Sequence, residues 1–220
     1  PASPPPPRGG TPIPSCACST WAAGMRDRRP GDWVTDLAGR HRLEDEVAQA
    51  LASHPELILA RRATHALDAL DFTVLGPGER LAQVELKAKH QPYREWAQLW
   101  PELAERDLFI LDELALRRIV DAGRYGFLLV RDMPEDRWAV WSTTELVLAT
   151  KVRVGRRLVT GVERTKGKVL IDLSGAAALT TTLPGALSSV ATLVGFIDRR
   201  WSDIAPWPCP ERSSCKGEAS

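Results

Sequence analysis

Two short apolar segments, residues 70–75 and 81–88, are joined by a Gly-Pro-Gly turn, and this arrangement constrains the fold more than any other feature. The second segment alternates in polarity, which predicts a β-strand with one apolar face and a second face that carries Glu85 and Lys87. The turn chemistry predicts that the two segments pair as an antiparallel hairpin. If the turn is centred on its second glycine, Asp71 lies directly across from Glu85.

The pairing of Asp71 with Glu85 has a chemical consequence. Directly opposed residues of a hairpin have Cβ atoms roughly 4.5–5.5 Å apart, so both carboxylates are able to hold one cation that offsets their repulsion. Mg²⁺ prefers oxygen ligands and keeps several waters, so one or two carboxylates suffice. The alternative is an ordinary strand, in which Glu85 and Lys87 form a solvated ion pair on the surface.

A helix that carries a glutamate is predicted before the hairpin. Residues 39–51 have an apolar stripe at helical spacing, and Glu44 lies at the edge of that stripe. The ordered set of Glu44, Asp71 and Glu85-Leu86-Lys87 resembles the PD-(D/E)XK nuclease superfamily, which includes restriction endonucleases and Holliday-junction resolvases. The resemblance covers about residues 37–142.

One position departs from the family pattern. Leu70 stands where the family usually has proline before the first acid. Asp68 is therefore an alternative first acid, although the hairpin register would place it opposite Ala88 rather than Glu85.

The resemblance implies a site and an activity. It implies that Glu44, Asp71, Glu85 and Lys87 are catalytic, and that Asp71, Glu85, the Leu86 carbonyl and Glu44 hold Mg²⁺ or Mn²⁺. Lys87 would orient the attacking water or stabilise the transition state. The implied activity is metal-dependent hydrolysis of phosphodiester bonds in DNA, in recombination, repair or defence. A homodimer is an expectation by analogy with relatives.

A basic segment follows the predicted nuclease-like region. Residues 151–168 hold seven Lys and Arg against Glu163 alone, a local balance of +6, whereas the whole chain has a net charge of only +1. We expect a β-hairpin there, whose basic side chains contact phosphates or are simply solvated. The predicted nucleic-acid contacts are Lys89, Lys151, Arg153, Arg156, Arg157, Arg164, Lys166 and Lys168.

The composition of the chain and its proline-rich start suggest how it is organised. With 220 residues, of which 44% are hydrophobic, the chain is long enough for one buried core. We expect a disordered proline-rich arm over 1–30, a nuclease-like core over 31–150, a hairpin and a helix packed on it over 151–205, and a flexible tail over 206–220. Met25 is a candidate natural start.

The positions of the cysteines and the hydropathy of the chain indicate where in the cell the protein is expected. Cys16, Cys18, Cys209 and Cys215 lie near the two ends, and we interpret them as unpaired thiols in a reducing cytoplasm. A zinc site that joins the two ends is the less favoured alternative. The most apolar late stretch, residues 186–197, is too short for the ~20 residues of a membrane span, so no membrane partner is expected.

The predicted elements give an α/β fold: a mixed central β-sheet flanked by helices, restriction-endonuclease-like, with a C-terminal β-hairpin and helix extension. Helices are predicted over residues 36–53, 93–100, 105–122, 142–149 and 184–203. Strands are predicted over residues 56–62, 70–75, 81–88, 126–131 and 138–141, with the hairpin over 151–173.

Three other functions stay open on the sequence. Related folds also cut RNA, so RNA is an alternative substrate. A non-catalytic nucleic-acid-binding or scaffold protein on a nuclease-like fold would use the basic hairpin without needing Mg²⁺. An unrelated α/β protein would have neither a cation site nor an acidic contribution from Glu44.

Overall fold

The computed structural model describes residues 30–63, 70–158 and 164–202, and the side chains of 38–63, 70–154 and 167–200. The chain divides into two compact units, residues 1–39 and 40–220. The description below concerns the second unit. The proline-rich arm, Met25, Asp68 and the four cysteines lie outside the described residues.

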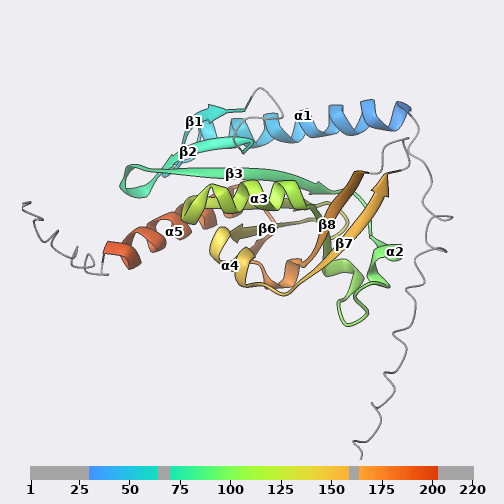
Figure 1. The fold of residues 1–220 in the computed structure, drawn as a ribbon. Coiled ribbons are helices and arrows are strands. Elements are labelled where there is room, and N and C mark those ends of the chain that lie inside the picture. The colour runs from blue at the N-terminus through green and yellow to red at the C-terminus, as the bar shows by residue number, and fades with distance from the viewer. Residues whose placement is uncertain (1–29, 64–69, 159–163, 203–220) are drawn as a thin grey trace, which may run out of the picture. The chain divides into compact units, whose positions relative to one another are not determined.

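Five helices and nine strands make up the described residues (Figure 1). The helices are α1 (Pro30–Ala52), α2 (Arg94–Ala97), α3 (Glu113–Asp121), α4 (Thr143–Leu148) and α5 (Leu183–Ser202). The strands are β1 (Ile58–Arg62), β2 (Phe72–Gly76), β3 (Arg80–Lys89), β4 (Leu108–Asp112), β5 (Gly126–Asp132), β6 (Arg137–Ser142), β7 (Lys151–Leu158), β8 (Arg164–Asp172) and β9 (Ala178–Thr180).

The strands form two sheets. The larger has six strands in the order β1-β2-β3-β5-β6-β9, and the smaller has three in the order β4-β8-β7. Strands β3 and β5 are parallel, and every other neighbouring pair is antiparallel. The fold is therefore a mixed α/β arrangement with a second, antiparallel sheet.

Each face of the six-stranded sheet has its own hydrophobic core. On one face, Leu43 and Val47 of α1 and the apolar side of α5 pack against even-numbered residues of β2 and β3. On the other face, α3, α4 and the β4-β8 sheet pack against β5 and β6. Figure 1 shows α3 in front of the sheet and α5 behind it. Strand β5 is buried on both faces, as its continuous apolar run predicts.

The predicted hairpin register is confirmed. Phe72 pairs with Val84 and Gly76 with Arg80, with a one-turn 3₁₀ helix over Pro77–Glu79 as the connection. Gly78 has φ +70°, a left-handed conformation that favours glycine. Continued by one residue, this register places Asp71 across from Glu85.

The helix predicted over residues 105–122 is wrong in its first half. Residues 108–112 form strand β4, and α3 begins only at Glu113. Strand β4 pairs with β8, from Leu108 with Asp172 to Asp112 with Lys168. This partner lies far along the sequence, so a run that fits a helical pattern locally becomes a strand in the folded chain.

The remaining predictions have mixed outcomes. Helix 93–100 is limited to the single turn of α2, and β9 was not predicted. The capping box at Ser142 and Glu145 is confirmed at the start of α4. Helix α5 forms as predicted, and among the described residues no helix is long and apolar enough to cross a membrane.

Candidate functional site

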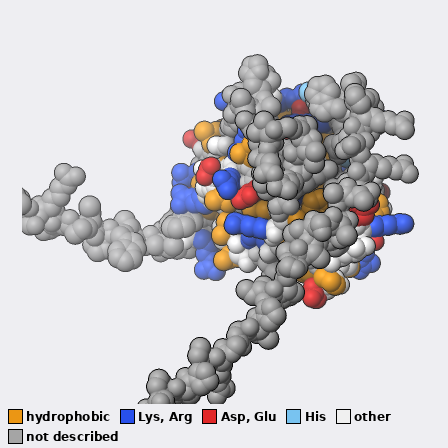
Figure 2. Space-filling view, turned by 45° about the vertical axis from the view of Figure 1, so that its right-hand side comes forward, with side chains coloured by type: hydrophobic (Ala, Val, Ile, Leu, Met, Phe, Trp, Pro, Cys, Tyr) orange, Lys and Arg blue, Asp and Glu red, His pale blue; other side chains and the backbone are white. Residues whose placement is uncertain are grey.

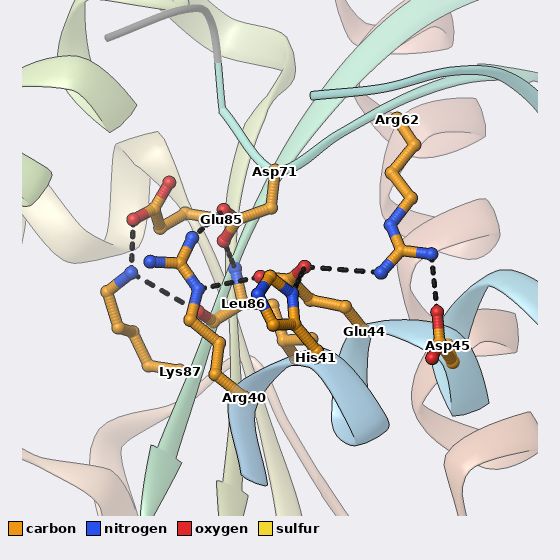
Figure 3. A network of polar contacts seen from close by, with 9 residues as sticks. All are labelled: Arg40, His41, Glu44, Asp45, Arg62, Asp71, Glu85, Leu86 and Lys87. Carbon is orange, nitrogen blue, oxygen red and sulfur yellow. Dashed lines mark hydrogen bonds and ion pairs between the residues drawn. The ribbon is translucent and has the colours of Figure 1, made fainter. Parts of the chain in front are cut away.

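The hairpin brings Asp71, Glu85 and Lys87 together around the backbone of Leu86 (Figure 3). Asp71 Oδ2 accepts a hydrogen bond from the Leu86 N–H at 2.8 Å. Lys87 Nζ donates to the Glu85 carboxylate and, at 3.2 Å, to the Leu86 carbonyl. Alternation along β3 puts Glu85 and Lys87 on one face while Val84 and Leu86 fill the core.

Helix α1 adds Glu44 to this group through an arginine. Arg40 lies one turn before Glu44, and its Nε donates to Glu44 Oε1 at 2.6 Å. Its Nη2 donates to Asp71 Oδ1 at 2.7 Å, so a single guanidinium bridges the helix and the hairpin (Figure 3). Arg62 of β1 makes a longer contact with Glu44 Oε2, at 3.3 Å.

The three acids are buried. Glu44, Asp71 and Glu85 are 8%, 8% and 5% exposed, although buried carboxylates ordinarily need partners to offset their desolvation. Burial raises the pKa of Glu85, and the neighbouring Asp71 adds to the rise, although Lys87 opposes it. A raised carboxyl pKa beside a second acid is common at sites that bind cations or transfer protons.

Glu44 shows the opposite shift. Burial would raise its pKa, but hydrogen bonds and charge from Arg40 and then Arg62 outweigh burial and lower it. The pKa of Arg40 is raised in turn: burial opposes the rise, and Glu44 and Asp71 overcome it. The site thus holds one acid with a lowered pKa and one with a raised pKa.

The donor atoms fit a hard divalent cation in their chemistry. Carboxylate oxygens from Glu44, Asp71 and Glu85 and the Leu86 carbonyl are the ligand types that Mg²⁺ and Mn²⁺ prefer. In the part of the chain that the structure describes, however, no three His, Cys, Asp or Glu side chains are grouped closely enough to hold a metal ion. Arg40 stands between two of the acids instead.

Lys89 does not lie where a phosphate contact requires. Its side chain is fully buried, and its Nζ donates to the Arg106 carbonyl and lies 3.6 Å from Asp132 Oδ1. Asp132 also accepts from Arg137, which reaches Asp107 at 2.8 Å. The prediction that Lys89 contacts nucleic acid is wrong, because this network covers the end of β3 and ties it to the start of β4.

The basic hairpin is formed by β7 and β8, but two of its lysines have local roles. Lys151 Nζ donates to the carbonyls of Leu146, Val147 and Ala149, so it caps the C-terminal end of α4. Lys168 pairs with Asp112. All three donors of the Lys151 ammonium are engaged by these carbonyls, and Lys168 is held by one ion pair, so phosphate binding stays an untested prediction for both lysines.

The other basic residues of the hairpin remain candidates. Arg153 is exposed. Arg156 pairs with Lys166 along the ladder, and Arg157 with Thr165. The side chains of Arg156, Arg157, Arg164 and Lys166 lie outside the described ones. On the face drawn in Figure 2, Lys and Arg side chains lie interspersed with Asp and Glu.

The sequence reasoning missed Arg40. Its spacing of four residues from Glu44 is the spacing of helical ion pairs, so that contact was readable from the sequence. The contact with Asp71 was not, because Asp71 lies 31 residues further on and belongs to a different element.

Comparisons with known proteins assign no family. No protein-family description matches this chain, and no curated protein is similar to it at a significant level. Among solved structures, the chain is similar to one described as a nuclease from a fusselovirus, with 10% identity and a TM-score of 0.35 over 79% of this chain and 99% of that one. Identity and TM-score this low assign neither a family nor an activity.

Proposed function

We propose that this protein is a metal-dependent nuclease that hydrolyses phosphodiester bonds in DNA, on a PD-(D/E)XK-like, restriction-endonuclease-like core. The observation that carries the proposal is the hairpin register: it sets Asp71 across from Glu85, with Lys87 on the same side and Asp71 bonded to the intervening backbone. Acidic side chains are seldom buried in proteins, so the burial of Asp71 and Glu85 distinguishes this group from an ordinary surface ion pair.

In this proposal Asp71, Glu85 and the Leu86 carbonyl hold Mg²⁺ or Mn²⁺, and Glu44 holds a second cation or positions a water. A bound divalent cation would polarise a phosphoryl oxygen and lower the pKa of a bound water. Lys87 is held beside Glu85 by its own hydrogen bonds, which favours a role in orienting the attacking water or stabilising negative charge in the transition state.

The hydrolysis that these residues would assist is simple to balance. The oxygen of water bonds to phosphorus, and the bond between phosphorus and the leaving oxygen breaks. The proton lost by water passes to solvent or to a site carboxylate, and the leaving oxygen takes up a proton. Exposed Arg153 and the distal basic residues of the β7-β8 hairpin are the proposed phosphate contacts.

The proposal is tested with the full-length chain and three isosteric variants, Asp71→Asn, Glu85→Gln and Lys87→Met. Each is incubated with linear, supercoiled, single-stranded and branched DNA, and with RNA, in Mg²⁺, Mn²⁺ or EDTA. We expect cleavage only with a divalent cation and a loss of at least about 10²-fold in each variant. Glu46→Gln, at an exposed position of α1, is the matched control and should cut like wild type.

A second function is favoured by a different observation. Arg40 forms ion pairs with both Glu44 and Asp71, an arrangement that also suits a nucleic-acid-binding or scaffold protein that does not cut. Salt-sensitive DNA binding that needs no divalent cation, survives all three substitutions and comes with no cleavage would favour that function. Cleavage of RNA but not DNA would change the proposed substrate to RNA and leave the proposed chemistry unchanged.

A further inference from the structure

Arg40 binds two of the carboxylates that the proposed metal ion would need as ligands. Its guanidinium contacts one oxygen each of Glu44 and Asp71, at 2.6 and 2.7 Å. The side chain of Arg40 is 50% exposed, whereas those of its two partners are each 10% exposed. The arginine is therefore the most solvent-accessible member of these two ion pairs.

Both oxygens of Asp71 already have partners. Oδ2 accepts from the Leu86 backbone N–H and Oδ1 accepts from Arg40. The Leu86 N–H is a backbone group of strand β3 and is fixed in position, whereas Arg40 is a long, half-exposed side chain that can change its conformation. If Asp71 has to free an oxygen for a cation, Arg40 is the partner that gives way.

Electrostatics points the same way. A divalent cation held by these carboxylates would be repelled by the positive charge of the guanidinium that contacts the same carboxylates. Without a cation, Arg40 relieves the cost of burying two acids close together. One group of carboxylates thus serves either Arg40 or the metal ion.

We infer that Arg40 is an internal counter-ion of the acidic site, which pairs with Glu44 and Asp71 when no divalent cation is bound and leaves them when one binds. The inference rests on the proposed function, since it assigns the regulation of that same site. The displaced guanidinium is a planar, bidentate donor suited to a phosphate group, so a nucleic-acid phosphate is the partner expected to receive it.

The relation between the two ligands follows by linkage. A phosphate that takes Arg40 frees carboxylate oxygens for the cation, and a cation that displaces Arg40 frees the guanidinium for a phosphate. Metal binding and nucleic-acid binding then strengthen each other by the same factor. In the absence of nucleic acid, wild-type protein is expected to bind divalent cations weakly.

Arg62 is the matched control. It also contacts Glu44, at 3.3 Å, but its shorter contact is with the exposed Asp45, at 2.6 Å. No contact joins it to Asp71 among the ion pairs of the described residues. Its removal takes away the same charge near the site without freeing an oxygen of Asp71.

The test measures binding of Mn²⁺ alone to full-length protein without nucleic acid, by the electron paramagnetic resonance of free Mn²⁺. We expect Arg40→Met to lower the Kd for Mn²⁺ at least about fivefold, Arg62→Met to change it less than about twofold, and Asp71→Asn to abolish binding in either background. Arg40→Lys keeps the charge but cannot bridge two acids, so an intermediate Kd is expected. If Arg40→Met does not fold, the Kd of Arg40→Lys is compared with that of wild type instead.

Three outcomes would overturn the inference, and they are distinguishable. If Arg40→Met binds Mn²⁺ no more tightly than wild type while Asp71→Asn abolishes binding, Arg40 is not a competitor and the metal site stands. If Arg62→Met and Arg40→Met tighten binding equally, the effect is general charge rather than displacement. If no variant shows Mn²⁺ binding that depends on Asp71, the metal site of the proposed function fails as well.

Discussion

Asp71 accepts a hydrogen bond from the backbone N–H of Leu86 at 2.8 Å, which ties one acid of the site to the strand that carries the next. The side chain thereby extends the β2-β3 ladder beyond its last backbone pair, Phe72 with Val84. The hairpin thus holds the Asp71 carboxylate beside strand β3.

Removing the Asp71 carboxylate should weaken the fold as well as the site. In Asp71→Ala the buried Leu86 N–H loses its acceptor, which costs about 1–3 kcal/mol of the free energy of unfolding. Asp71→Asn keeps an acceptor oxygen and should cost less. Urea denaturation in EDTA measures both, with Glu46→Ala as an exposed control. Equal stability of Asp71→Ala and wild type would contradict the assigned hydrogen bond.

Glu85 should make stability fall as pH rises. Burial, opposed by Lys87 and reinforced by Asp71, raises its pKa, so its ionised form is less favourable in the folded protein than in the unfolded chain. Stability is then lost as pH rises from the unfolded pKa, about 4.3, through the folded pKa. We expect Glu85→Gln to gain melting temperature relative to wild type at pH 7 and to lose that advantage near pH 4, in EDTA.

Glu44 should show the opposite sign and is the internal control for Glu85. Although burial opposes it, Arg40 and Arg62 lower the pKa of Glu44, and His41 Nδ1 faces the same carboxylate at 3.6 Å. Its ionised form therefore stabilises the fold above the unfolded pKa, and this stability is lost as pH falls through the folded pKa. Glu44→Gln should melt below wild type at pH 7, with a smaller gap near pH 4. The same sign for both variants would refute the two assigned environments.

Displacement of Arg40 onto a phosphate should appear in the salt dependence of DNA binding. Lys87→Met is expected to cut poorly, so binding in Mg²⁺ is compared between Lys87→Met and the double variant Arg40→Met/Lys87→Met. Loss of one phosphate contact should reduce the slope of log K against log salt by about 0.9. The matched double variant with Arg62→Met should keep the slope. An unchanged slope without Arg40 would mean that its guanidinium does not move to a phosphate.

Lys89 should matter for stability and not for binding. Its ammonium is fully buried beside Asp132, and burial lowers its pKa although Asp132 opposes the fall. Lys89→Ala leaves a buried carboxylate with one partner fewer, a change that typically costs about 3–5 kcal/mol when a buried ion pair is broken. Lys89→Met should cost less and leave the salt slope of DNA binding unchanged. If the slope of log K for DNA binding against log salt were smaller in Lys89→Met than in wild type, Lys89 would be a phosphate contact after all.

Much of the candidate site was predictable because it is local. Asp71 and Glu85 are joined by a short turn whose residues select the hairpin, and alternation along β3 settles which side chains share a face. The stripe on α1 likewise predicted the burial of Leu43 and Val47. Strand alternation correctly put Lys89 on the same face as Lys87, but it did not predict that Lys89 is buried in contact with Arg106 and Asp132.

The remaining features depend on residues that are distant in the sequence. Residues 108–112 become β4 because they pair with β8, which lies some 60 residues later, and Lys168 pairs with Asp112 across that ladder. The bridge from Arg40 to Asp71 has the same origin.

The hairpin, its register and the set of acids with a lysine were readable from the sequence, because turn chemistry and strand alternation act over short distances. The packing of distant elements settled that Arg40 pairs with Glu44 and Asp71, and which basic side chains are exposed. Long-range packing sets these features, because a charge that becomes buried must find a partner from whichever element the fold brings beside it.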